Sequence, residues 1–172
     1  MDAKTMMMNG VPMAAVEGLV NAVKSDPANG QTKWNAVTTW KGGLACESKI
    51  RNHTVHMNEP TALGGTDTAP NMVENVLAAY GSCLVVGYTL NAALRGITIK
   101  DLKVELEGDL DLAGFLGLSE TVPAGFSGIR AKVHLDSDGS PDAIQAMHAQ
   151  VLKTSPVGCI LTKPLKVTTE LV

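Results

Sequence analysis

A long apolar stretch in the middle of the chain constrains its fold more than any other feature. From Asn71 to Leu94 the sequence has helical spacing, with apolar side chains on nearly every side. Asn71 and Glu74 have the spacing of a capping box, so we expect the helix to begin there and to end near Arg95-Gly96. Such a helix must be enclosed by other structure. Small and polar residues interrupt it and favour a core helix over a membrane span: Gly81, Ser82, Gly87, Thr89 and Asn91.

Shorter elements on both sides of this helix indicate the fold class. We expect helices over 13–24 and from Ser140-Pro141, a short helical turn from Ser155-Pro156, and an irregular excursion over 108–125. Alternating patterns predict strands over 34–40, 44–49, 50–57, 102–106, 129–135 and 167–171. This order is typical of an α+β protein with an antiparallel sheet packed on the long buried central helix.

The domain and assembly predictions follow from the same pattern. We see no repeat or linker, so we expect a single domain over 1–172, with residues 1–30 as an N-terminal helical extension. An all-round apolar helix is hard to cover with the sheet of so small a chain. We therefore expect a homodimer in which two central helices pack together.

Charge and cysteine content exclude several classes of protein. The net charge is −3 and basic residues do not cluster, so we expect no nucleic-acid partner. Three cysteines without a C-x-x-C motif fit neither a secreted disulfide framework nor a zinc site. The first twelve residues have no signal-peptide pattern. We expect a cytoplasmic protein with no membrane partner, no metal and no other cofactor.

Cys83 is the first candidate for chemistry. At helical spacing it shares a face with apolar or small residues, namely Met72, Val76, Ala79, Gly87 and Leu90. Desolvation disfavours a thiolate, which is the reactive form of the side chain. Taken alone, these residues favour an inert buried cysteine, and reactivity requires a cation supplied from elsewhere.

A motif around Cys83 changes this interpretation. Residues 59–83 read E-P-x-x-L-G-G-x-D-x-x-P-N-x-V-E-x-x-L-A-A-x-G-S-C. With the segments 91–97, 107–110 and 155–157, they resemble a divergent branch of the OsmC/Ohr family (osmotically inducible protein C-like, organic hydroperoxide resistance). The likeness spans roughly residues 34–172, and many spaced positions agree at once.

The resemblance implies an OsmC-like fold in an intertwined homodimer and a thiol-dependent peroxidase active in oxidative-stress defence. A first cysteine, corresponding to Cys83, attacks the O–O bond of an organic hydroperoxide and becomes a sulfenic acid. A second cysteine condenses with it, and a dithiol reductant, often lipoyl-linked, resets the site. The apolar face around Cys83 suits an alkyl or fatty-acyl tail.

The chain departs from the family pattern in three places. Ser155 stands where the second cysteine is expected, and Cys159, one helical turn later, is the candidate substitute or a buried helix residue. The activating Arg of the family has no counterpart in the first hairpin, so Arg51 is the best replacement, unless it is a surface strand residue. We expect Glu74 to cap the helix, which leaves Glu59 to orient a cation.

Other residues are assigned by their neighbourhood. We place His53 on the same strand face as Arg51 and therefore near the substrate, with Met72, Val76 and Tyr80 of the helix. An H-x-x-H pair on a strand points to opposite faces, so His53, His56 and Cys46 are not expected to bind a metal. We interpret His134 and His148 as surface residues.

Three functions remain open at this point. The first is the thiol peroxidase with Cys83 as its nucleophile. The second is a non-catalytic protein of the same fold that binds an apolar small molecule or acyl chain, which Ser155 favours. The third is a redox sensor or peroxidase with one working cysteine, resolved by external thiols.

Overall fold

In a computed structural model, residues 7–172 are described, and the α+β class is confirmed. Their contacts form two compact units. One is Ala14–Val76, and the other joins the described residues up to Met13 with Leu77–Val172. The single domain over 1–172 remains a prediction.

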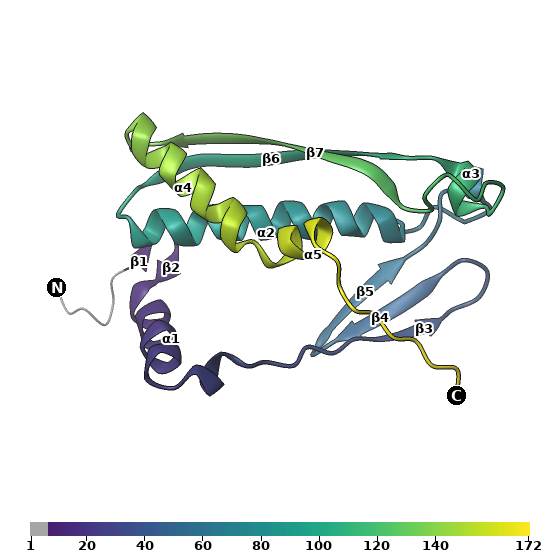
Figure 1. The fold of residues 1–172 in the computed structure, drawn as a ribbon, viewed down its shortest axis with the longest axis horizontal. Helices are drawn as coiled ribbons and strands as arrows, with labels where there is room; N and C mark the ends of the chain where they lie inside the picture. The colour runs from purple at the N-terminus through teal and green to yellow at the C-terminus, as the bar shows by residue number, and fades with distance from the viewer. Residues whose placement is uncertain (1–6) are drawn as a thin grey trace. The chain divides into compact units, whose positions relative to one another are not determined.

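The Ala14–Val76 unit contains a three-stranded antiparallel sheet in the order β3-β4-β5 (Figure 1). Its elements are α1 (Met13–Ser25), the 3-10 turns η2 (Pro27–Gly30) and η3 (Thr61–Leu63), and the strands β3 (Val37–Trp40), β4 (Cys46–Ile50) and β5 (His53–Met57). The predicted helix over 13–24 is confirmed. The third strand begins later than predicted, because Ile50 pairs with His53 and leaves Arg51 in the turn with a φ of +54°.

The capping box at the start of the central helix α2 (Met72–Leu94) is confirmed. The Asn71 amide N–H donates to Glu74 Oε2 at 2.8 Å, and the Glu74 amide N–H donates to Asn71 Oδ1 at 2.8 Å. The helix ends before Gly96, which has a φ of +67°. Local sequence therefore sets both ends of the helix.

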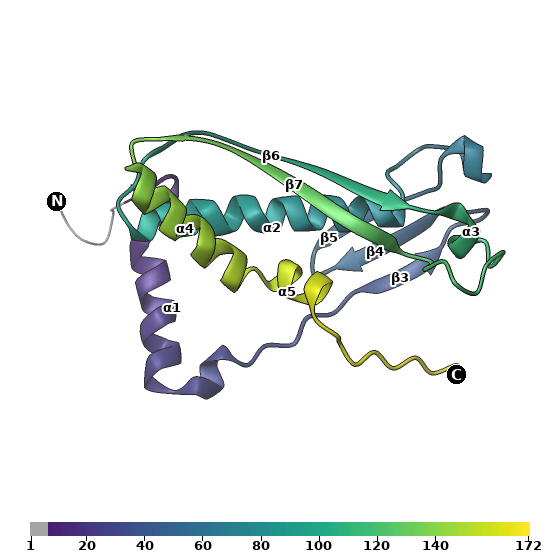
Figure 2. The same cartoon turned by 45° about the horizontal axis from the view of Figure 1, so that its top comes forward.

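The second unit packs a long hairpin and two helices against α2. The hairpin is β6 (Ile99–Leu110) and β7 (Phe126–Ser137), joined through the short helix α3 (Leu112–Phe115). Figures 1 and 2 both show the hairpin running alongside α2, with α4 (Pro141–Thr154) lying across the helix and α5 (Pro156–Thr162) following it. The core of this unit consists of Leu84, Tyr88, Ala92, Ile97, Met147 and Val151.

Two segments differ from the sequence prediction. The last strand, predicted over 167–171, is wrong, because the chain after α5 has no strand or helix. A small hairpin of β1 (Met7–Met8) and β2 (Val11–Pro12) was not predicted. Asn9 and Gly10 form its turn, both with positive φ, and Asn9 Nδ2 donates to the Ile97 carbonyl at 2.8 Å.

A large part of α2 is open to solvent in the single chain. Of the 18 most apolar consecutive residues of α2, 28% are buried, and the side chain of Val86 is 65% exposed. Its length and composition also satisfy the requirement for a membrane span, a test that core helices of soluble proteins pass as well. The exposed side is the one for which the sequence predicts a second copy of α2, and the homodimer remains a prediction.

Candidate active site around Cys83

The Cys83 side chain is half-buried on α2 and contacts Ser155, the residue that precedes α5. Its Sγ lies 3.3 Å from Ser155 Oγ, and Ser155 is only 6% exposed. Ser155 Oγ also accepts a hydrogen bond from the Gly158 amide N–H at 3.0 Å. In this contact either the Ser155 hydroxyl or the Cys83 thiol can donate, and once the thiol is ionised only the hydroxyl can.

The local sequence of α5 explains this position of Ser155. Ser155 is the N-cap, with an extended backbone (φ −70°, ψ 114°), and Pro156 occupies the first helical position. Gly158 permits close packing, because a Cβ there would lie 3.0 Å from Ser155 Oγ and 3.3 Å from the Tyr80 ring. The start of α5 is therefore held close to α2, and the hydroxyl is fixed on the thiol.

A pocket of about 530 Å³ opens beside Cys83 and is predominantly apolar. Its walls include Ala79, Gly87 and Leu90 from α2, as the helical spacing predicted, and Val151 from α4. The lining contains no charged residue. The pocket therefore suits a hydrocarbon group, and a cation for the thiolate has to come from outside its lining.

Three residues assigned to the site lie outside this pocket. Tyr80 lines a separate pocket of about 360 Å³ with residues of β7 and α5. Met72 and Val76 lie in the first turns of α2, 42% and 37% exposed. Their contacts with a substrate remain predictions.

Cys159 also lies outside the pocket lining and is exposed. It follows Ser155 by four residues, but Ser155 has an extended backbone, so the rule that helical residues four apart share a face does not apply to this pair. Its role as a resolving cysteine remains a prediction.

The remaining candidates belong to the Ala14–Val76 unit. Arg51 is exposed in the β4–β5 turn, so the prediction that it shares a strand face with His53 is wrong. Glu59 is 8% exposed, and its Oε2 accepts a hydrogen bond from Asn71 Nδ2 at 3.2 Å. The approach of Arg51 or Glu59 to Cys83 remains a prediction.

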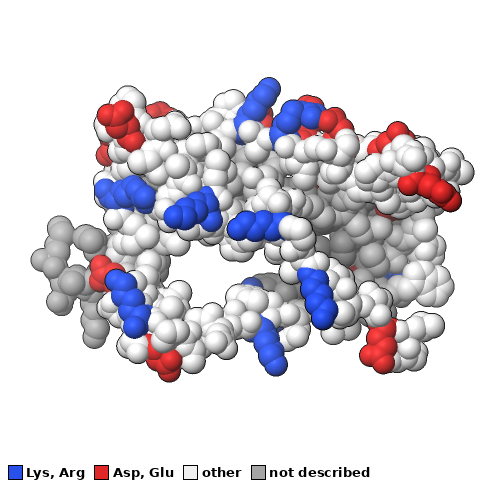
Figure 3. Space-filling model, viewed as in Figure 1, with Lys and Arg blue, Asp and Glu red and all other residues white. Residues whose placement is uncertain are grey.

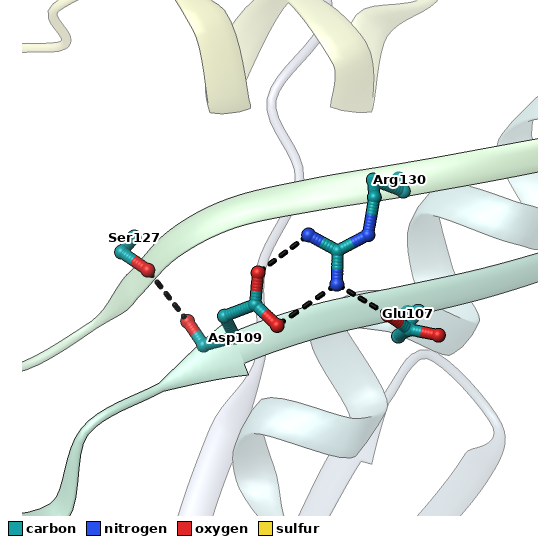
Figure 4. Close-up of polar contacts among 4 residues, drawn as sticks. All are labelled: Glu107, Asp109, Ser127 and Arg130. Carbon is teal, nitrogen blue, oxygen red and sulfur yellow. Dashed lines mark hydrogen bonds and ion pairs between the residues drawn. The ribbon is translucent and has the colours of Figure 1, made fainter.

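Arg130, a cation of the Cys83 unit, is already paired. Figure 4 shows it on β7, bonded to both carboxylate oxygens of Asp109 at 2.5 and 2.8 Å and to Glu107. The hydrogen bond from Arg130 lowers the pKa of Asp109. Basic and acidic side chains are mixed over this hairpin in Figure 3. Arg130 thus belongs to a surface ion pair.

One buried contact was missed from the sequence. His148 is half-buried, and its Nδ1 forms a hydrogen bond with the hydroxyl of the buried Tyr88, so its interpretation as a surface residue is wrong. Burial raises the pKa of Tyr88. The apolar spacing of Met147 and Val151 marks the buried side of α4, and His148 lies beside it. His134, by contrast, is exposed and bonds to Glu105, as expected for a surface residue.

Comparison with known proteins identifies the family. The model of the OsmC-like protein family matches residues 65–170. A search of curated proteins finds no match. The fold is similar to that of an OsmC-like protein from Mycoplasma pneumoniae, with a TM-score of 0.66, 16% identity, and coverage of 76% of this chain and 88% of that one.

Two further solved structures share the fold. An organic hydroperoxide resistance protein OsmC from Legionella pneumophila has a TM-score of 0.57 at 18% identity, covering 77% of this chain and 92% of that one. An organic hydroperoxide resistance protein from Elizabethkingia anophelis has a TM-score of 0.54 at 18% identity, covering 77% and 91%. The matched segment contains α2 with Cys83 and α5 with Ser155, and the chain belongs to the OsmC-like protein family.

Proposed function

We propose that this protein is a thiol-dependent peroxidase that reduces organic hydroperoxides in oxidative-stress defence in the cytoplasm, with Cys83 as the nucleophile. The observation that carries the proposal is the contact between Cys83 Sγ and Ser155 Oγ at the edge of an apolar pocket. Membership of the OsmC-like family and similarity to two organic hydroperoxide resistance proteins support a redox or stress role.

The proposed chemistry uses these contacts. The Cys83 thiolate attacks the terminal oxygen of the hydroperoxide and forms an S–O bond, so that Cys83 becomes a sulfenic acid. The O–O bond breaks, and the alkoxide leaves as an alcohol after taking a proton. The hydrocarbon part of the substrate occupies the apolar pocket. The Ser155 hydroxyl donates to the anionic sulfur, which favours the thiolate because hydrogen bonds to a charged group are stronger than those to a neutral one.

The thiolate also requires a positive charge, which the pocket lining lacks. We assign this role to Arg51, oriented by Glu59, in a homodimer that covers the exposed apolar side of α2. Val86, 65% exposed beside the pocket, is the kind of residue that a second copy buries. Arg51→Ala should lower the rate of peroxide reduction without changing the fold, and sedimentation analysis should detect a dimer.

The direct test is consumption of cumene hydroperoxide with reduced lipoamide. We expect turnover by the wild-type protein and none by Cys83→Ser, measured by the loss of peroxide, while Cys46→Ser remains active as the control. Activity that survives Cys83→Ser would remove the proposed mechanism.

The uncharged, apolar lining of the pocket also favours a second candidate, a protein that binds an acyl chain or another apolar molecule without turnover. Under this alternative the native Cys83 thiol resists alkylation, and Cys83→Ser binds a fluorescent fatty acid as well as the wild type does. Rapid alkylation of Cys83 together with peroxide turnover decides for the peroxidase.

A further inference from the structure

A second pocket of the Cys83 unit, of about 360 Å³, lies between α2, the start of β7 and α5. Its lining consists of Tyr80 from α2, residues 126–129 of β7, and Leu161 and Thr162 of α5. None of these residues lines the pocket beside Cys83. The proposed chemistry of Cys83 leaves this second pocket unused.

A β-bulge in β7 directs consecutive side chains toward this pocket. The register of β6 and β7 shifts between Asp109 and Leu110, which leaves Ser127 as an extra residue on β7. Consecutive side chains of a regular strand point to opposite faces, whereas a bulge redirects them. The bulge therefore explains why Phe126 and Ser127 both line the pocket. Gly108 of β6 leaves room for the Phe126 ring, because a Cβ there would lie 2.7 Å from it.

The lining is uncharged and combines aromatic rings with hydrogen-bond acceptors. Tyr80 and Phe126 supply rings on which another ring can pack. The Ser127 hydroxyl donates to a β6 carbonyl at 3.3 Å (Figure 4), and the Thr162 hydroxyl donates to an α5 carbonyl at 2.7 Å. Because both hydroxyls use their protons on the backbone, their oxygens are left to accept a hydrogen bond. The pocket therefore favours a neutral ring with an O–H or N–H donor, and it disfavours an anion, which would lack a charged partner.

The pocket shares α5 with the candidate active site. The start of α5 lines the Cys83 pocket, whereas its last residues, Leu161 and Thr162, line this one. The Tyr80 ring lies against Gly158, where a Cβ would come within 3.3 Å of it. Of its own residues, α5 buries only Gly158. A molecule that contacts both Tyr80 and the end of α5 would add to the few contacts that hold this helix.

We propose that this pocket binds a small neutral aromatic molecule with a hydrogen-bond donor, of the phenol class, and that the bound molecule stabilises α5 in its position against α2. The volume suits a single ring, because it lies near the lower end of the roughly 300–1,000 Å³ that is typical of ligand pockets. The ring packs against Tyr80 and Phe126, and its donor bonds to Ser127 or Thr162. The site is separate from Cys83, so the inference does not depend on the proposed peroxidase function.

The test is a titration of the full-length protein with phenol, followed by two-dimensional proton–nitrogen NMR. We expect the amide signals of Tyr80, 126–129 and 161–162 to shift. Anisole, which has no donor, and benzoate, which is an anion, should bind about fivefold more weakly, the usual effect of one lost hydrogen bond.

Hydrogen exchange at saturating phenol tests the stabilisation of α5. The Cys159 and Lys163 amide N–H groups donate to carbonyls four residues earlier, at 2.9 and 3.0 Å, and should exchange more slowly when phenol is bound. The Ile144 amide N–H makes the same kind of bond at 3.0 Å in α4, and its exchange should not change.

Matched variants separate this pocket from the one beside Cys83. The double variant Ser127→Ala/Thr162→Val removes the acceptors and should weaken phenol binding about fivefold, to the level of anisole. Thr154→Val is the control, because it loses a threonine bond to the backbone of the same kind, at 2.8 Å, but lines the Cys83 pocket. It should bind phenol as the wild type does. Leu161→Trp should remove binding, because the larger side chain fills the pocket from a position that is 38% exposed.

Signal shifts centred on the Cys83 pocket, or phenol binding that Leu161→Trp does not weaken, would overturn the site. Equal affinity for anisole or benzoate would overturn the chemistry of the ligand, and unchanged exchange in α5 would overturn its stabilisation. Cys83→Ser should bind phenol as the wild type does, whether or not the protein reduces peroxides.

Discussion

Two helices of this protein begin with the same dipeptide, Ser-Pro, and the same kind of cap. Ser140 Oγ accepts a hydrogen bond from the Ala143 amide N–H at 3.3 Å, and Ser155 Oγ accepts one from Gly158 at 3.0 Å. Ser140 is exposed, whereas Ser155 is buried against the Cys83 sulfur. One serine therefore has a local role alone, and the other combines that role with a contact at the candidate site.

The two helices are also held by different forces. α4 buries Met147 and Val151 completely in the core and reaches Tyr88 through His148. α5 buries only Gly158 of its own residues, next to its buried cap. Because its buried side chains hold α4 against the core, α4 can lose its N-cap and stay in place. The position of α5 depends on Ser155 and Gly158, so the geometry at Cys83 depends on them as well.

The largest effect should come from the core of α4. Met147→Ala should lower the free energy of unfolding by about 2–5 kcal/mol, because it leaves a cavity at a fully buried side chain. Leu152→Ala on the same helix, 48% exposed, should have a much smaller effect. Chemical denaturation measures both, and equal effects would contradict the anchoring of α4 by its core.

The loss of either serine cap should lower stability, and the loss of Ser155 should cost at least as much as the loss of Ser140. Ser140→Ala should lower the free energy of unfolding by about 1 kcal/mol, the usual cost of a lost serine cap. Ser155→Ala loses the same cap and also the contact of a buried side chain with Cys83. Chemical denaturation measures both, and a cost for Ser140→Ala well above that for Ser155→Ala would contradict the dependence of α5 on its cap.

Gly158→Ala should have a smaller effect on stability and a visible effect on the site. Alanine improves helix propensity by about 1 kcal/mol, which offsets most of the cost of the tight contacts with Ser155 and Tyr80. The new methyl group should displace Ser155 from Cys83 and slow the alkylation of Cys83, measured by mass spectrometry. Unchanged alkylation would indicate that α5 adapts without moving the hydroxyl.

The smallest effect at neutral pH should come from the contact between Tyr88 and His148. Burial raises the pKa of Tyr88, so its contribution to stability is complete below the unfolded value of about 10 and is lost as the pH rises through the folded value. Unfolding experiments above pH 10 should show a loss of stability that is weaker in Tyr88→Phe. The same pH dependence in both proteins would contradict this assignment.

Local signals in the sequence predicted the parts of the fold that depend on neighbours in the chain. Asn71 and Glu74 determine the start of α2 by bonding to each other three residues apart. The alternating pattern over 167–171 fitted a strand, but a strand also needs a pairing partner, which that segment lacks among residues 7–172. The sequence pattern placed Arg51 on a strand. The turn at Arg51 results from the pairing of Ile50 with His53, and local sequence does not show which residues pair.

The sequence predicted only the part of the site that lies on the central helix. Helical spacing placed Ala79, Gly87 and Leu90 beside Cys83, because all four lie on one helix. The contact between Cys83 and Ser155 joins residues 72 positions apart and depends on the packing of α5 against α2. The motif identified Ser155 as a departure from the family, and only the structure shows that this hydroxyl touches the sulfur.

The most direct test of the account is the rate of Cys83 alkylation by iodoacetamide in Ser155→Ala and Ser140→Ala, followed by peptide mass spectrometry. Both variants lose a cap, but only one loses a hydrogen bond to the sulfur. We expect Ser155→Ala to react about tenfold more slowly than the wild type, the effect of one charge-assisted hydrogen bond, and Ser140→Ala to react at the wild-type rate. Equal rates in the two variants would contradict the claim that Ser155 supports the Cys83 thiolate.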